Sequence, residues 1–424
     1  MADRRLVIVD PGHFHAALIQ KKMLPGLSPD AHVYAPLGRD LIDYLAHIER
    51  FNNRVVAPTN WRLAVHAGDD FLDRFAQEPP GAIVVFAGRN RGKIERIRRA
   101  VQAGMHVLAD KPAIIDRKDL PVLEEVLDAA KRDGLVVRDL MAGRHDSVGQ
   151  IMRALMHDPD VFGEPLAGSI AEPTVEIDSV HHLMKEVAGV PGLRPAWYFD
   201  ITEQGEGLAD IGTHLVDRVH NALFPGEAID WRDDIRLLDA ARWPTMLSLT
   251  QFREVTGEAG WPDFLGPWLR GDDFEYFCNM RATYAVRGVH VRLEARWNWQ
   301  APHGDTHSAV YRGSRARLEL RQGTAESYRP ELYVVPQAEI AAALERRITT
   351  VREAYPGIRL VRHDGEWQVE IPAALRLGHD AHFTLFARDF LRQVADPNAR
   401  PAWETPNMMA KYFACTEAVA LSHQ

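Results

Sequence analysis

The stretch Leu6-Val7-Ile8-Val9-Asp10-Pro11-Gly12-His13-Phe14-His15 places a short apolar strand directly before a tight turn and a helix start. Free backbone N–H groups at such a start, together with the helix dipole, form a site for a pyrophosphate. Against the pattern G-x-G-x-x-G only the middle glycine is present, as Gly12, where the backbone must approach the phosphates closely. Asp10 and His15 replace the outer two glycines. Two interpretations of His13 and His15 stay open: they donate to the phosphate, or they only cap and pack the helix.

Around this stretch, strands and helices alternate through the first 140 residues. The apolar run at residues 81–87 is typical of a parallel strand buried on both faces. Short connections between alternating elements predict a doubly wound parallel sheet. The other expected strands are residues 31–35, 105–109 and 135–137, and the expected helices are residues 14–23, 91–103 and 120–132.

The pattern changes after about residue 145. Apolar and polar residues alternate at residues 282–286, 289–295 and 316–320, which indicates half-buried, mostly antiparallel strands. Helices are expected at residues 148–157, 379–395 and 407–422. The sequence therefore predicts an α/β Rossmann domain over residues 1–145 and an α+β domain over residues 146–424, the latter with a large open sheet.

Composition excludes several classes of protein. A net charge of −9 and a pI near 6.1 argue against a nucleic-acid binder. No apolar run reaches membrane-spanning length, and the early strand leaves no room for a signal peptide, so we expect a cytoplasmic protein. Cys278 and Cys415 lack a CxxC spacing, which excludes a disulfide framework and a thiolate zinc site.

The second strand of a Rossmann domain should end in an acid that holds the adenosine ribose of NAD. Here it ends Ala35-Pro36-Leu37-Gly38-Arg39, without an acid. Arg39 could accept the 2′-phosphate of NADP, or it could be a solvated surface residue. The choice between NAD and NADP therefore stays open.

A possible proton-transfer group lies in two other places. Asp210 and His214 are four residues apart, so a helix would carry both side chains on one face. Lys111 directly follows the strand at residues 105–109. Three such groups could handle the proton of one hydroxyl while a cofactor takes a hydride. The buried side of the Asp210 segment is marked by Leu208, Ile211 and Leu215.

These landmarks together resemble the glucose–fructose oxidoreductase / inositol dehydrogenase (Gfo/Idh/MocA) family over nearly the whole chain. The resemblance implies a nicotinamide cofactor, a sugar, polyol or glycoside substrate, and catalytic positions at Lys111, Asp210 and His214. Asp110-Lys111-Pro112 stands where the family has Glu-Lys-Pro. The other matching elements, in order, are Gly12, Ala87-Gly88-Arg89-Asn90, Ala103-Gly104-Met105-His106-Val107, Arg144 and Asp210-Ile211-Gly212-Thr213-His214.

Residues 181–207 and 304–307 look like a subgroup of oxidoreductases with a distinctive C-terminal domain, linked to glycoside oxidation at C3. We expect substrate contacts from imidazoles, aromatic rings and a guanidinium, which suit sugar faces and hydroxyls; the alternative is packing between domains. The candidates are Arg144, His181, His182, Trp197 and Tyr198. The expected cofactor-binding residues are Gly12, His13, Phe14, His15, Pro36, Gly38, Arg39, Ala87, Gly88, Asn90, Asp110 and Lys111.

We expect no metal site, because no carboxylate-rich cluster accompanies the histidines that could otherwise be grouped as ligands. Those histidines are His303, His307, His379 and His382. They are more simply interpreted as packing or substrate contacts.

The sequence thus predicts an NAD(P)-dependent dehydrogenase of a secondary sugar hydroxyl. Two alternatives stay open: an NAD-dependent glycosidase or lyase that oxidises C3 transiently, and a non-catalytic sugar-binding or sensor protein that lost its cofactor. A large open sheet with an uncovered face also predicts a homo-oligomer, a dimer or tetramer, formed through the C-terminal sheet.

Overall fold

The computed structural model describes residues 3–187, 190–301 and 303–424. The chain divides into two compact units. The first contains residues up to 142, 202–205 and 378–412, and the second contains the remainder. The N-terminal unit therefore includes a late segment of the chain, residues 378–412. The expected boundary at residue 145 as a domain limit stays a prediction.

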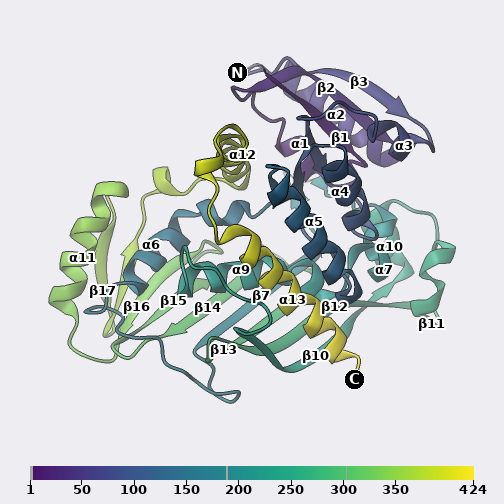
Figure 1. Ribbon diagram of the computed structural model, residues 1–424. Helices are drawn as coiled ribbons and strands as arrows, with labels where there is room; N and C mark the ends of the chain where they lie inside the picture. Colours follow the sequence, from purple (N-terminus) through teal and green to yellow (C-terminus); the bar gives the residue numbers. More distant parts are fainter. Residues whose placement is uncertain (1–2, 188–189, 302) are drawn as a thin grey trace. The chain divides into compact units, whose positions relative to one another are not determined.

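The first unit contains a six-stranded parallel sheet (Figure 1). Its strands, in spatial order, are β3 (Arg62–Ala67), β2 (Leu27–Ala35), β1 (Arg4–Val9), β4 (Ile83–Phe86), β5 (His106–Ala109) and β6 (Val137–Asp139). This is the doubly wound order, so the predicted fold class of this part is confirmed. The strand order reverses between β1 and β4, where open α/β sheets bind ligands.

Helices accompany these strands, and the first is shorter than predicted. It ends at Leu18 rather than near residue 23. Beyond the helix, the carbonyl of Gln20 accepts a hydrogen bond from Trp61 Nε1 at 2.7 Å. The helices are α1 (His15–Leu18), α2 (Arg39–Asn53), α3 (Phe71–Phe75), α4 (Lys93–Gln102), α5 (Leu120–Arg132), α12 (His379–Ala395) and the first part of α13 (Glu404–Ser422), up to Tyr412.

The apolar core of the first unit joins its early and late segments. Ile8, Val33 and Val85 from the sheet pack in one cluster with Phe383 and Phe386 of α12. The late segment thus belongs to this core. Tyr412 further ties α13 to the sheet, because its hydroxyl donates to Asp139 Oδ2 at 2.7 Å.

The second unit contains a ten-stranded sheet. All neighbouring strands are antiparallel except the pair β13–β7, as expected for a large, mostly antiparallel sheet. In spatial order the strands are β10 (Ile235–Ser248), β12 (Asp273–Val286), β13 (Val289–Gln300), β7 (Val175–Met184), β14 (Thr306–Arg312), β15 (Ala316–Gln322), β16 (Glu331–Pro336), β18 (Glu366–Glu370) and β17 (Arg359–His363), with β11 (Leu269–Arg270) beside β12.

Helices and short elements complete the second unit. Its helices are α6 (Ser147–Met156), α8 (Gly207–Asp210), α9 (Gly212–Leu223), α10 (Leu249–Thr256) and α11 (Ala341–Ala354), while the residues of α7 (Ile201–Gln204) are divided between the two units. A two-stranded sheet joins β8 (Glu186–Val187) and β9 (Val190–Pro191). The 3-10 helices of the chain are Arg117–Asp119, Ala142–His145, Ala196–Phe199, Asp263–Trp268, Ala373–Leu375 and Pro397–Ala399.

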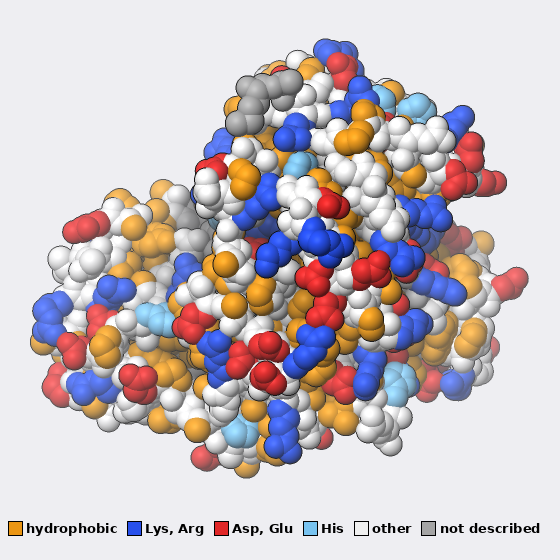
Figure 2. Space-filling view, in the orientation of Figure 1, with side chains coloured by type: hydrophobic (Ala, Val, Ile, Leu, Met, Phe, Trp, Pro, Cys, Tyr) orange, Lys and Arg blue, Asp and Glu red, His pale blue; other side chains and the backbone are white. Residues whose placement is uncertain are grey.

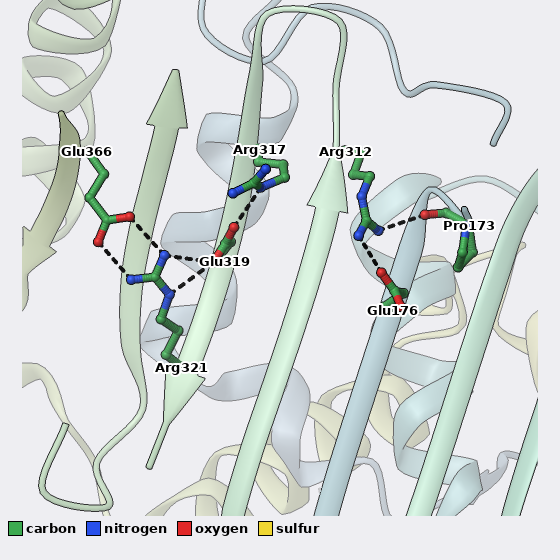
Figure 3. Close-up of polar contacts among 7 residues, drawn as sticks. All are labelled: Pro173, Glu176, Arg312, Arg317, Glu319, Arg321 and Glu366. Atoms are coloured by element: carbon green, nitrogen blue, oxygen red, sulfur yellow. Dashed lines mark hydrogen bonds and ion pairs between the residues drawn. The ribbon is translucent and has the colours of Figure 1, made fainter. Parts of the chain in front are cut away.

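One face of the large sheet carries paired charges (Figure 3). Arg312 donates to Glu176 and to the carbonyl of Pro173. Arg321 donates to Glu366 at 2.7 and 2.8 Å and to Glu319 at 2.7 and 2.9 Å. On this face, opposite charges neutralise one another within β15, between the adjacent strands β14 and β7, and across β16 from β15 to β18. Assembly through this sheet stays a prediction.

No helix in the described ranges combines the length and the apolarity needed to cross a bilayer. On the face drawn in Figure 2, acidic and basic side chains are interspersed rather than gathered by sign.

Candidate active site

The loop at residues 10–15, called the phosphate loop after the contact that the sequence predicts, forms a tight turn in which Asp10 stands at the position of the first glycine. Asp10 adopts φ +50°, in the left-handed region where aspartate is one of the few tolerated side chains. Gly12 N donates to the Asp10 carbonyl at 2.9 Å, and His13 N donates to the Ala87 carbonyl at 2.8 Å. The loop is therefore fixed between the ends of β1 and β4, at the point where the strand order reverses.

Gly88, after β4, is required by a close backbone approach. A Cβ at this position would lie 2.0 Å from the Asp10 carbonyl oxygen and 3.2 Å from Gly12 N. No side chain fits there without moving the loop. Gly12, Ala87 and Gly88, expected from the sequence to bind a cofactor, thus lie around one backbone turn.

The carboxylate of Asp10 is buried and paired. It is 2.8 Å from Arg96 Nη1 and 3.5 Å from Arg89 Nη1, and Arg89 is also 3.4 Å from Asp40. Two guanidinium groups offset the charge that replaces the first glycine. The buried negative charge of Asp10 is therefore compensated within the protein.

His13 and His15 share one buried acceptor, Asp110. Their Nδ1 atoms are 2.8 and 3.0 Å from the two oxygens of Asp110, and their rings are 4.1 Å apart. Burial alone would raise the pKa of Asp110, but the charges and hydrogen bonds of His15 and His13 hold it well below its usual range. Phe14, between them, is 51% exposed. Asp110 therefore orients both imidazole rings through their Nδ1 atoms.

Ligand-type atoms of His13, His15 and Asp110 lie within 4.8 Å of one another. The spacing of these atoms is explained without an ion, because each imidazole Nδ1 is within hydrogen-bond distance of a different Asp110 oxygen. The expectation that the protein needs no metal stays a prediction.

Lys111 follows Asp110 at the carboxyl end of β5, where its backbone is held by a buried lysine. Lys93 Nζ donates to the Asp110 carbonyl at 2.9 Å and to Asn90 Oδ1 at 2.5 Å. Asn90 Nδ2 in turn donates to the carbonyl of Gln204 at 2.7 Å. Burial lowers the pKa of Lys93 to about 8. Asn90, expected to contact cofactor, therefore also supports the Lys111 segment.

The end of β2 presents no acid at the ribose position. Pro36 and Gly38 form an extended connection, with Gly38 at φ 179°. Arg39 is exposed and lies 3.6 Å from Asp43, one helical turn later. Asp40, which the sequence did not single out, lies 3.4 Å from Arg89 Nη1, the atom that also approaches Asp10.

Asp210 and His214 lie on two helices rather than one. The segment breaks at Ile211, which ends α8 and precedes α9. The predicted buried residues Leu208 and Leu215 are 1% and 2% exposed. The carboxylate-bearing residue Asp210 is 6% exposed, while His214 is partly exposed. Lys111 belongs to the first unit and the pair to the second, so their joint action stays a prediction.

Arg144, an expected substrate ligand, forms a two-pronged ion pair. Its Nε and Nη2 donate to Asp217 at 2.8 and 2.6 Å. This geometry orients both side chains strongly. Its role toward substrate stays a prediction.

His181 and His182 converge on Asp305, although they point to opposite faces of β7. Their Nδ1 atoms are 3.3 and 3.1 Å from the Asp305 oxygens, and Lys185 Nζ is 2.5 Å away. Burial opposes ionisation of Asp305, but the hydrogen bonds and charges of His181 and Lys185 hold its pKa well below its usual range. Ser179 Oγ lies 2.9 Å from His181 Nε2. His181 is thus oriented on both ring nitrogens.

Trp197 and Tyr198 are buried at 7% and 5% exposure in one aromatic cluster. The Tyr198 ring packs against Tyr276 and Trp297, and its carbonyl accepts from the Tyr276 hydroxyl at 3.1 Å. Packing accounts for these positions. A substrate contact from either stays a prediction.

The other histidines are dispersed. His303 is exposed beside Tyr328, and His307 Nε2 is 3.3 Å from Arg218 Nη1. His382 is buried on α12. The side chain of His379 lies outside the described residues.

Sequence reasoning missed three of the charged residues that organise these sites: Lys93, Asp217 and Arg218. Asp217 and Arg218 follow the His214 motif on the same helix, so their spacing was an available signal. Lys93 had no such signal, because a charged residue at a helix start ordinarily faces solvent.

Comparison with known proteins adds the relationships of the chain. A putative oxidoreductase from Parabacteroides merdae is 41% identical over 99% of this chain and 98% of its own, with a TM-score of 0.96. KijD10, a 3-ketoreductase from Actinomadura kijaniata in complex with NADP and TDP-benzene, is 15% identical over 100% of this chain and 98% of its own, with a TM-score of 0.57.

GenD2 from gentamicin A biosynthesis, in complex with NAD, is 15% identical over 100% of this chain and 95% of its own, with a TM-score of 0.60. KijD10 and GenD2 show that the fold is shared. None of the curated proteins compared with this chain matches it.

A family model, "Putative oxidoreductase C terminal domain", matches residues 151–423. The match covers more than half of the sequence and includes the Asp210–His214 motif, the large sheet and the final helix. The chain therefore belongs to this family of Gfo/Idh/MocA-type oxidoreductases.

Proposed function

We propose that this protein is an NAD(P)-dependent dehydrogenase that acts on a secondary hydroxyl of a sugar, polyol or glycoside. The observation that carries the proposal is the phosphate loop. Its backbone keeps a glycine-turn shape at the reversal of strand order, and the Gly88 position leaves no room for a side chain. Similar folds, in KijD10 and GenD2, are described with NADP and with NAD.

The residues present fit a dinucleotide. Gly12 and the start of α1 offer backbone N–H groups to the pyrophosphate, and His13 and His15, both oriented by Asp110, are the side chains assigned to donate to the phosphate. When bound, the nicotinamide accepts a hydride from the substrate carbon.

The proton-transfer roles fall to residues that the family resemblance singles out. We assign removal of the hydroxyl proton to His214, or to Lys111 through it, and the orientation of His214 to Asp210. Lys93 and Asn90 would fix the backbone that presents Lys111. The sugar, polyol or glycoside class rests on the same resemblance.

The test is stoichiometric. Purified protein should be incubated with NAD or NADP and a panel of sugars, polyols and glycosides, while reduced cofactor and product are both quantified. A dehydrogenase forms one reduced cofactor for each product. Product without net cofactor reduction would favour the glycosidase or lyase alternative, and failure to bind either cofactor would favour the non-catalytic one.

A further inference from the structure

A pocket open to solvent lies in the second unit, between α6 and α9 on one side and β7, β14 and β15 on the other, and Arg218 in its lining is exposed. Its volume of about 50 Å³ is enough for a few water molecules or one carboxylate-sized group. Apolar side chains form its floor, including Ile177, Ala309, Tyr311 and Leu320, and the charged side chains that line it come from the two helices and the loop before α6.

The two carboxylates of this cavity are already engaged. Asp217 takes both prongs of Arg144, at 2.6 and 2.8 Å. Asp146 caps α6 by accepting from Gly149 N at 3.1 Å. The Arg144–Asp217 pair is neutral as a whole, and the helix start stabilises the Asp146 charge.

Two further guanidinium groups face neutral partners. Arg153 donates to the amide oxygen of Asn221 at 2.8 Å, and Arg218 approaches His307 Nε2 at 3.3 Å. A guanidinium can only donate, so this His307 nitrogen is the acceptor and the ring is neutral. Burial, and then the charges of Arg218 and His181, lower the pKa of His307 well below its usual range.

The lining therefore has an excess of positive charge. Within the described residues, neither Arg153 nor Arg218 has a carboxylate oxygen within 4.0 Å, whereas Arg144 has one at 2.6 Å. An anionic group is the partner that bidentate guanidinium donors prefer. Arg218 also lies four residues after His214, one turn along α9.

We propose that this cavity is a substrate subsite for an anionic substituent, a carboxylate or a phosphate, held by Arg218 and Arg153. The inference rests on the proposed function, because it takes the molecule that carries the anionic group to be the substrate of the dehydrogenase. It adds that the preferred substrate carries a negative charge beside the hydroxyl-bearing part. His307 would keep the subsite selective, because a neutral acceptor aligns Arg218 without neutralising it.

The test compares three probes by calorimetry on the full chain: D-glucose, D-glucuronate and D-glucose 6-phosphate. At least one anion should bind about tenfold or more tightly than glucose, and which one does so distinguishes carboxylate from phosphate. Arg218→Met should remove about tenfold to a hundredfold of that affinity. Arg218→Lys should retain part of it, and Arg236→Met, an exposed arginine on β10 outside the cavity, should change nothing.

Arg153→Met is the second variant, should Arg218→Met fail to fold, and it should reduce anion affinity in the same direction. Equal binding of the three probes, no binding of either anion, or an anion preference that survives both variants would overturn the inference. A cofactor titration of the same samples tests the proposed function separately, because the anion preference is measured without turnover.

Discussion

Two regions of this molecule depart from their sequence patterns in opposite ways. In the phosphate loop the pattern is degenerate, yet the backbone keeps the shape that the glycines would give, with Asp10 at φ +50°. In the Asp210–His214 segment the pattern is complete, yet the expected continuous helix is broken at Ile211. The phosphate loop thus forms its tight turn without two of the motif glycines, whereas the Asp210–His214 segment has every motif residue but not the expected continuous helix.

The difference follows from what each glycine does. At position 10 a glycine would only supply a backbone conformation, which aspartate can also adopt once Arg96 and Arg89 balance its charge. At position 212 a Cβ would lie 2.6 Å from Leu208 Cδ2, so the residue must be small for α8 and α9 to pack. Another residue can supply the backbone conformation at position 10, whereas a larger residue does not fit the space at position 212.

The largest effect is expected where the motif is complete. Lys111→Ala and His214→Ala should each lower kcat by about a hundredfold to ten-thousandfold, with cofactor affinity near normal. The proposed mechanism has the two act as one unit, so it predicts that the double variant is little worse than the poorer single one. Asp210→Asn should chiefly shift the pH–rate profile, measured by steady-state kinetics.

Lys118→Ala is the matched control, since Lys118 is exposed and its amine pairs with Asp116. Independent, multiplying losses in the double variant would show that Lys111 and His214 do not share one proton-transfer step. Unchanged kcat in His214→Ala would show that the Asp210–His214 motif takes no part in the proton transfer.

The second prediction concerns Lys93, which holds the backbone before Lys111, and the pH dependence of the free energy of unfolding. The pKa of Lys93, about 8 in the folded protein because of burial, is below the ordinary 10.5. Between these values the unfolded chain binds a proton that the folded chain does not, so stability rises with pH. The free energy of unfolding should therefore increase from pH 8 to 10.5 relative to Lys93→Met, by about 3 kcal/mol. Denaturant titrations across that range measure the difference.

Lys118→Met provides the comparison, because an exposed lysine should produce no such slope. Parallel curves for the parent and Lys93→Met would mean that Lys93 keeps its proton throughout, and that its contacts rather than its burial dominate.

The sequence was sufficient for the alternation of strands and helices and for the position of α5 and α12, because their apolar spacing is strong. It was insufficient for α2 and β3. The strand β3 lies at the sheet edge with four of six residues exposed, so it lacks an apolar run. The helix α2 buries only Leu41, Tyr44 and Ile48, a stripe that charged residues interrupt.

Site residues divide in the same way. Gly12 and Lys111 were found because chain order alone places them at strand ends. Asp305, which lies 3.3 and 3.1 Å from His181 and His182, stood in the quoted segment 304–307 but without a partner, since strand pairing across the sheet decides that contact. The contacts of Asp10 with Arg89 and Arg96 could not be predicted either, because the pairing of β1 with β4 brings these segments together.

A third prediction tests whether space is indeed the fixed requirement. Gly88→Ala should push the Asp10 carbonyl away, because its Cβ would lie 2.0 Å from that oxygen. We expect a loss of about 1–3 kcal/mol in stability and of most cofactor affinity. Thermal unfolding and cofactor titration measure the two. Gly92→Ala, at a glycine with φ +65° and open space around its Cβ position, is the control for backbone strain alone. Normal cofactor binding in Gly88→Ala would remove this turn from the cofactor site.

The smallest effect is expected just after β2, where we propose that the adenosine ribose binds and where Arg39 and Asp40 carry opposite charges. Arg39 is exposed near Asp43, and Asp40 is directed toward Arg89. With a cation and an anion side by side, neither cofactor is strongly excluded, so the Kd values for NAD and NADP should differ by less than about a thousandfold, or about 4 kcal/mol. Arg39→Ala should weaken NADP about fivefold and leave NAD unchanged, because only NADP offers a 2′-phosphate.

Arg50→Ala, exposed on the same helix, should affect neither cofactor, and Asp40→Asn should favour NADP slightly by removing a negative charge. Equal losses for NAD and NADP in Arg39→Ala would mean that this guanidinium contributes only general attraction. A thousandfold preference for NAD in the parent would mean that another group holds the ribose. The phosphate loop would then have kept its selectivity, as well as its shape, without the residues of the motif.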